Sequence, residues 1–85
     1  MKTFTYTIKD PLGIHARPAG NLVAEAKKYT CSIIIKAKGK ESDLKRLFGL
    51  MGLCIKSNDN IEVIFDGVDE DKAFIAIKEL FESSL

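Results

Sequence analysis

"TFTYTI", residues 3–8, alternates strictly between apolar and hydroxyl side chains. Phe4, Tyr6 and Ile8 fall on one face of an extended chain, and the three threonines fall on the other. A strand of this kind is typical of an antiparallel sheet that has one buried face and one face in water. This stretch therefore predicts a sheet that is covered on one side only.

Further strands and three helices can be placed along the rest of the chain. Segments rich in β-branched residues predict strands at 31–37 and 61–65, with a short return strand at 40–43. Apolar residues at helical spacing predict helices over 16–29, 44–54 and 68–84. In the first of these helices, the buried stripe is predicted to be Ala16, Ala19, Leu22, Val23, Ala26 and Tyr29. The order β-α-β-β-α-β-α, with each helix apolar on one side, predicts an α+β domain in which helices cover one face of an antiparallel sheet.

Length and composition fit a small globular protein. The 85 residues are enough for a single domain, 1–85. Hydrophobic residues make up 46% and charged residues 29%, which is ordinary for a soluble protein. No apolar run approaches the ~20 residues of a membrane span, and the N-terminus lacks the apolar core of a signal peptide. We therefore expect a cytoplasmic protein without membrane insertion.

Charge is distributed unevenly along the chain. Residues 1–40 hold eight Lys or Arg and two Asp or Glu, whereas residues 41–85 hold five and ten. The basic half suits an anionic ligand or an acidic protein partner. The near-neutral total of +1 argues against a nucleic-acid binder.

The two cysteines, Cys31 and Cys54, lie among aliphatic residues and belong to no metal or redox motif. We expect both to be buried, reduced thiols. Because the chain also has a single histidine, we expect no metal site.

That histidine, His15, lies in "GIHARPA", residues 13–19, at the predicted start of a helix. A lone histidine is most often a surface or capping residue. A general base in a hydrolytic triad is a second possibility, but it requires a nucleophile and an orienting acid. The one acid nearby is Asp10, across a turn, and no triad pattern is present.

The neighbours of His15 favour a third interpretation. At the start of a helix the N–H groups of Ala16 and Arg17 are unpaired and form an anion site. The helix dipole adds positive charge, and the guanidinium of Arg17 matches phosphate oxygens. Gly13 and Pro18 shape and stiffen the turn that aims these groups. Together they suit a nucleophilic imidazole that lies inside a phosphate pocket and forms a covalent phosphohistidine.

The motif "GIHARPA" at 13–19, with "LKRLFGLMGL" at 44–53, closely resembles the HPr family of histidine-containing phosphocarriers of the bacterial sugar phosphotransferase system. The resemblance extends from Met1 to about Ser84. It implies an open-faced β-sandwich, with three helices over a four-stranded antiparallel sheet, and a phosphocarrier rather than an enzyme.

The resemblance also implies roles and partners. His15 would take a phosphoryl group on Nδ1 from enzyme I, which is charged by phosphoenolpyruvate, and pass it to the IIA domains of sugar permeases. Arg17 would neutralise the phosphoryl oxygens, no cofactor would be needed, and the protein would be a monomer. The alternative is a regulatory HPr-like module in nitrogen or catabolite signalling, whose binding to partners depends on the phosphorylation of His15.

A shared docking surface on the two helices over 16–29 and 44–54 is implied as well. Its expected members are Gly20, Ala24, Lys27, Lys45, Arg46, Leu47, Phe48 and Met51. We expect some of the apolar members to turn inward and others to remain exposed within a basic rim.

Two positions depart from the family pattern. Many relatives have a serine, phosphorylated by an ATP-dependent kinase, just before the second helix; here the residue is Arg46. That regulatory switch should therefore be absent. A polar residue is common three positions before the histidine, where this chain has Leu12. A side-chain contact to the phosphate is thereby lost, while backbone contacts can remain.

Overall fold

The chain folds in the predicted order β-α-β-β-α-β-α. The computed structural model describes all residues 1–85. Its elements are β1 (Lys2–Thr7), α1 (Ala16–Ala26), β2 (Ser32–Ala37), β3 (Lys40–Asp43), α2 (Leu47–Gly52), β4 (Asn60–Asp66) and α3 (Glu70–Ser84).

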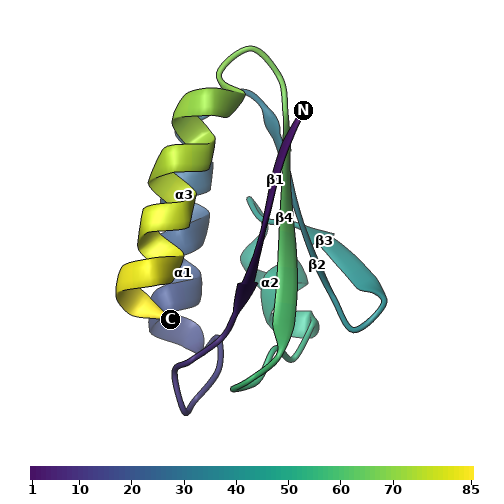
Figure 1. The fold of residues 1–85 in the computed structure, drawn as a ribbon, viewed down its shortest axis with the longest axis vertical. Coiled ribbons are helices and arrows are strands. Elements are labelled where there is room, and N and C mark those ends of the chain that lie inside the picture. Colours follow the sequence, from purple (N-terminus) through teal and green to yellow (C-terminus); the bar gives the residue numbers. More distant parts are fainter.

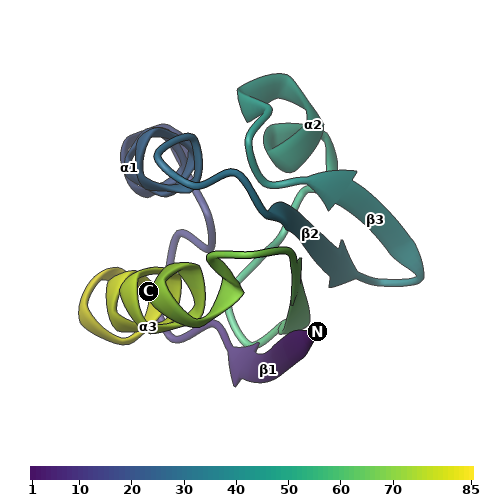
Figure 2. The ribbon, with the colours of Figure 1, turned by 90° about the horizontal axis from the view of Figure 1, so that it is seen from above.

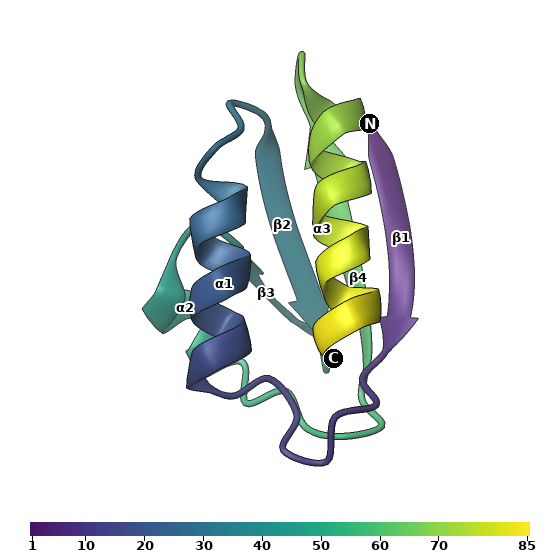
Figure 3. The same cartoon turned by 90° about the vertical axis from the view of Figure 1, so that its left-hand side faces the viewer.

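The four strands form one antiparallel sheet in the order β1-β4-β2-β3, so the last strand in sequence lies between the first and the second (Figure 1). All three helices lie on the same side of this sheet (Figure 2). The helices α1 and α3 run side by side in front of the strands (Figure 3). The predicted open-faced sandwich is confirmed.

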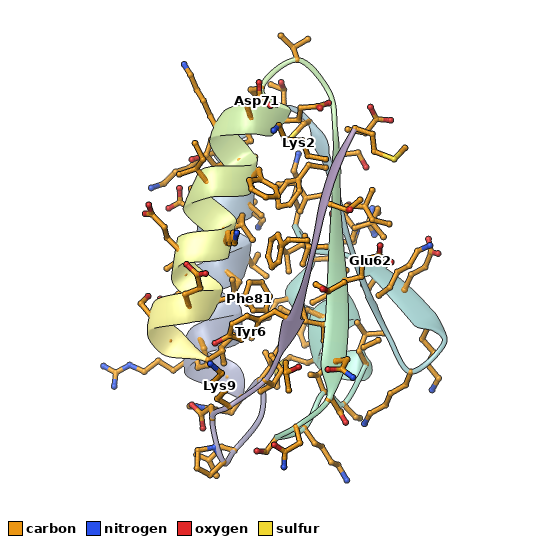
Figure 4. The ribbon with its side chains drawn as sticks, in the orientation of Figure 1. Lys2, Tyr6, Lys9, Glu62, Asp71 and Phe81 are labelled. Carbon is orange, nitrogen blue, oxygen red and sulfur yellow. The ribbon has the colours of Figure 1, made fainter.

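Alternation along each strand decides which side chains enter the core. In β1, Phe4 is buried while Thr3, Thr5 and Thr7 are exposed, as the opening stretch predicts. Tyr6 and Phe81 lie between β1 and α3, whereas Glu62 projects from the uncovered side (Figure 4). The ring of Phe4 lies 5.6–5.9 Å from three other phenylalanine rings, those of Phe65, Phe74 and Phe81. These offset and edge-on contacts join β1, β4 and α3.

The helix α1 is shorter than predicted, and two of the six residues predicted for its buried stripe are not buried. It ends at Ala26. The N–H of Lys27 still bonds four residues back, to the carbonyl of Val23, but those of the next two residues bond three residues back and tighten the chain into a turn. Tyr29, predicted at its end, is half-buried beyond the helix. Ala16 is exposed, contrary to the prediction. Helical side chains tilt toward the N-terminus, so the methyl group of the first residue points past the end of the helix.

The helix α2 begins later and ends earlier than predicted. Leu44 is fully buried but precedes the helix, and its N–H extends the sheet by bonding to the carbonyl of Ile33. Cys54 follows the helix in the left-handed region, at φ 52°, and is exposed. Because this conformation turns the chain away from the helix axis, the thiol leaves the apolar side. The prediction of a buried Cys54 is wrong, and that of a buried Cys31 is confirmed.

None of the helices is long and apolar enough to span a bilayer.

Candidate functional site

His15 occupies the N-cap position of α1. Its backbone is extended, with φ −100° and ψ −179°, and its imidazole makes no capping hydrogen bond. Its side chain is 38% exposed. The preceding residue, Ile14, is buried and donates its N–H to the carbonyl of Ile55 at 3.1 Å. The imidazole is therefore accessible to a partner and has a fixed backbone on both sides.

The turn that leads to His15 requires glycine at position 13. Gly13 adopts φ +67°, and its N–H bonds to the carbonyl of Asp10 at 2.9 Å. A Cβ atom there would collide with the carbonyl oxygen of Ile55 and would lie 2.6 Å from the Cα atom of Lys56. Only glycine combines this conformation with such a close approach. The contact holds the site loop against the segment that follows α2.

Unpaired backbone donors gather next to the imidazole. The N–H groups of Ala16 and Arg17 have no acceptor within the chain, and Pro18 has no N–H. The first helical bond of α1 runs from the N–H of Ala19 to the carbonyl of His15, at 3.0 Å. Two amides and the positive end of the helix dipole thus form an anion site.

The side chain of Arg17 is exposed and makes no hydrogen bond or ion pair. Its guanidinium is therefore free to meet an anion at the helix start. Pro18, in contrast, is buried and anchors the first turn to the core.

The carboxylate of Asp10 lies on the other side of the imidazole. Its Oδ2 atom is 3.5 Å from Nε2 of His15, and its side chain is 23% exposed. Its Oδ1 atom accepts the N–H of Leu12 at 2.8 Å. Leu12 itself is 72% exposed and directs its side chain into solvent. The sequence suggested Asp10 only as the acid of a triad. The turn between Asp10 and His15 was the one signal in the sequence for their contact.

The predicted docking residues lie on α1 and α2 or in the segments directly beside them, and these two helices are neighbours on the helical side of the sheet (Figure 2). Phe48 is 90% exposed and Leu47 is exposed beside it, whereas Met51 is half-buried against the core. The inward residue of α2 is Leu50, which the sequence analysis did not single out. Of the other members, Ala24, Lys27 and Arg46 are exposed and Gly20 is half-buried. We call the set Gly20, Ala24, Lys27, Arg46, Leu47, Phe48 and Met51 the α1–α2 surface.

Lys45 is occupied within the fold. Its ammonium group donates to the carbonyls of Tyr29 and Cys31, each at 2.7 Å, and its side chain is half-buried. These bonds attach the segment before α2 to the turn after α1. The positive charge that remains free on the α1–α2 surface is that of Lys27 and Arg46.

The remaining reactive groups of the chain lie elsewhere. Burial raises the pKa of the Cys31 thiol to about 11, which keeps this thiol protonated and unreactive. No group of three or more His, Cys, Asp or Glu side chains is arranged to hold a metal ion.

Comparison with known proteins places these features in a family. Residues 2–83 match the family described as "PTS HPr component phosphorylation site". The phosphocarrier protein HPr of Mycoplasma genitalium is 45% identical over 85 residues, covering 99% of this chain and 97% of that protein.

Solved structures agree with this match. A histidine-containing phosphocarrier protein, from a study of the divergence of mycoplasma from Gram-positive bacteria, superposes with a TM-score of 0.95 at 37% identity, covering 98% of this chain and 94% of that one. An HPr dimer from Thermoanaerobacter tengcongensis gives a TM-score of 0.78 at 34% identity, covering 98% and 95% of the two chains.

Proposed function

The chain belongs to the HPr family of phosphocarrier proteins, and on that premise we propose that it accepts a phosphoryl group on Nδ1 of His15 from enzyme I and passes it to the IIA domains of sugar permeases. It is a carrier of the phosphotransferase system and not an enzyme. The observation that supports the proposed site best is the position of His15. Its imidazole is free of capping bonds and lies at a helix start with two unpaired N–H groups.

Each group at the helix start has a part in the proposed transfer. The lone pair of Nδ1 attacks phosphorus, and the phosphoryl oxygens accept hydrogen bonds from the N–H groups of Ala16 and Arg17. The guanidinium of Arg17 adds a charge-assisted bond to the same oxygens. Because the two N–H groups are fixed by the helix before the phosphoryl group arrives, they need little reorganisation during transfer.

The α1–α2 surface is the proposed docking site for both partners. Phe48 and Leu47 expose apolar area that a partner can cover. Lys27 and Arg46 are exposed cations without an ion pair, at the C-cap of α1 and the N-cap of α2. An apolar centre with a charged rim suits a carrier that must bind and leave two partners in turn.

We place this exchange in the cytoplasm, where enzyme I and the IIA domains would be met. The protein is proposed to act as a monomer. Because a solved relative is a dimer, sedimentation at the working concentration should accompany the functional assay, and a stable dimer would contradict this part of the proposal.

The test is reconstitution of phosphoryl flow. Enzyme I, phosphoenolpyruvate and a IIA domain are incubated with and without this protein, and the mass of IIA is followed with time. We expect IIA to gain phosphate only when the protein is present. Substituting Phe48→Ala should weaken this transfer, whereas Ile75→Ala, at an exposed site on α3, serves as the matched control. Failure of IIA to gain phosphate with several IIA domains would reject the carrier function.

A further inference from the structure

We propose that Asp10 is a positioning residue for the phosphoryl transfer, which fixes the proton of the neutral His15 imidazole on Nε2 and so leaves the lone pair on Nδ1. This inference rests on the proposed function and adds a residue to its site. The observation that carries it is the contact between Oδ2 of Asp10 and Nε2 of His15, at 3.5 Å.

The carboxylate is held in place by the fold. The N–H of Asp10 donates to the carbonyl of Leu85 at 2.9 Å, and the carbonyl of Asp10 accepts the N–H of Gly13 at 2.9 Å. One carboxylate oxygen, Oδ1, accepts the N–H of Leu12 at 2.8 Å. With both backbone groups and Oδ1 engaged, the other oxygen is directed at the imidazole. Asp10 forms no ion pair with a lysine or arginine, so its charge acts on His15.

The chemistry of imidazole makes this contact consequential. A neutral imidazole carries one N–H and one lone pair, and an acceptor beside one nitrogen draws the proton to it. A carboxylate beside Nε2 therefore leaves Nδ1 as the nucleophile. The separation of 3.5 Å is longer than a formed hydrogen bond. Such bonds commonly tighten when the reacting complex assembles.

In the proposed step one bond to phosphorus forms as another breaks. Nδ1 forms a bond to phosphorus, while the bond between phosphorus and the donor atom of enzyme I breaks and its electron pair leaves with the donor. The ring keeps its Nε2 proton and becomes a phosphoimidazolium cation. The carboxylate of Asp10 faces that developing charge. The same contact that selects the nucleophilic nitrogen also stabilises the product.

Asp10→Asn is the sharpest variant. An asparagine can still accept the N–H of Leu12 through its carbonyl oxygen, so the turn is kept. Its NH₂ group then faces Nε2 and donates to it, which moves the ring proton to Nδ1. We expect nitrogen NMR to show the proton of neutral His15 on Nε2 in the natural protein and a marked shift toward Nδ1 in the variant. Phosphoryl acceptance within the enzyme I complex should slow at least about tenfold, since a wrong tautomer blocks the attacking nitrogen.

Two further variants separate positioning from structure. Asp10→Ser retains an acceptor for the N–H of Leu12 but places neither a carboxylate nor an amide beside the imidazole. Its rate of phosphoryl acceptance should therefore lie between those of the natural protein and Asp10→Asn. Asp43→Asn is the matched control. Asp43 accepts the N–H of Lys45 in an equivalent turn at 2.8 Å and is not paired with His15. This control should leave the imidazole spectrum unchanged.

The outcomes distinguish this inference from the function on which it rests. If the natural protein takes no phosphate on His15, the proposed function fails and the role of Asp10 fails with it. If the natural protein is phosphorylated while Asp10→Asn keeps the natural tautomer and the natural rate, only the inference is overturned. A proton on Nδ1 of the natural protein would overturn it without any variant. The inference would be supported by a rate of phosphoryl acceptance that falls from the natural protein to Asp10→Ser and then to Asp10→Asn, with equal binding of enzyme I by all three.

Discussion

Arg17 is the one cationic side chain that neighbours His15 on the first turn of α1, and it has no partner within the chain. Its guanidinium has no structural bond to lose, so its removal should alter chemistry and leave the fold intact. A hydrogen bond to a charged group is worth about 1.5–3 kcal/mol. If the transition state loses all of this energy, the rate of transfer falls by on the order of ten- to a hundredfold.

We therefore predict that Arg17→Ala slows phosphoryl transfer in both directions by such a factor and leaves the melting temperature nearly unchanged. Rapid-mixing measurements of transfer from enzyme I and to IIA would test this. Lys72→Ala is the control, because it removes one exposed positive charge from α3 that makes no hydrogen bond or ion pair. Equal rates for Arg17→Ala and the natural protein would show that the backbone N–H groups suffice.

Arg46 bears on a second property of single residues, phosphorylation by a serine kinase. It occupies the N-cap of α2, the position at which the family resemblance implies a kinase-target serine in many relatives, and it offers no hydroxyl. The nearest serine, Ser42, is half-buried, and its Oγ atom lies against the backbone at Gly49. We predict that the serine kinase acting on relatives leaves this protein unlabelled with ATP and labels Arg46→Ser. Peptide mass mapping checks this. Stoichiometric phosphate on Ser42 or Ser57 of the natural protein would contradict it.

At the scale of elements, Asp69 connects the start of α3 to the turn between α1 and β2. Its two carboxylate oxygens accept the N–H groups of Thr30 and Cys31, each at 2.9 Å. These bonds hold the pKa of Asp69 below its usual range, and the bond to Thr30 has the larger effect. A lowered pKa in the folded state means that the carboxylate stabilises the fold above the pKa of the unfolded chain. This stabilisation is lost as the pH falls through the folded-state value.

We predict that Asp69→Ala lowers the melting temperature at neutral pH and that the difference from the natural protein shrinks in acid, where the natural carboxylate is protonated. Thermal melts across the acidic range would measure this. Asp71→Ala removes an exposed carboxylate paired only with Lys2 at 3.3 Å, and it should have a much smaller effect. A constant difference at all pH values would mean that the charge of Asp69 contributes nothing.

The elements also show what periodicity can predict. Strict alternation in β1 and the apolar stripe of α3 identified both elements, because their buried faces are set by spacing alone. The predicted ends of α2 were wrong. Leu44 and Cys54 fit the helical period, but the backbone of Leu44 extends the sheet and that of Cys54 forms a left-handed turn. Likewise, the motif pointed to His15 and Arg17, but the contact of Asp10 with Nε2 and the inward ammonium of Lys45 depend on how loops fold back. Such tertiary contacts leave no period in the sequence.

On the scale of the whole molecule, free positive charge lies along α1 and on the α1–α2 surface. Exposed Lys27 and Arg46 lie on the α1–α2 surface, with Arg17 at the start of the same α1, whereas α3 begins with Glu70 and Asp71. An acidic partner would therefore be attracted to the helical face that carries the proposed site.

We predict that the association rate with enzyme I falls as ionic strength rises, because salt screens exposed charges beyond about 10 Å at 0.1 M. The dissociation rate should change much less. Stopped-flow binding at low and high salt would measure both, and Arg46→Ala should reduce the salt dependence. Association that is indifferent to salt would mean that Phe48 and Leu47 dominate the encounter.

The central claim is that His15 carries the phosphoryl group, and the most direct measurement is the mass of the protein after incubation with enzyme I and phosphoenolpyruvate, compared with that of His15→Ala. The natural protein should gain one phosphate that is labile in acid and stable in alkali. The variant should gain none while keeping its fold, because the imidazole makes no capping bond whose loss would destabilise α1. Acid-labile phosphate on His15→Ala, or an acid-stable phosphate on the natural protein, would contradict the account.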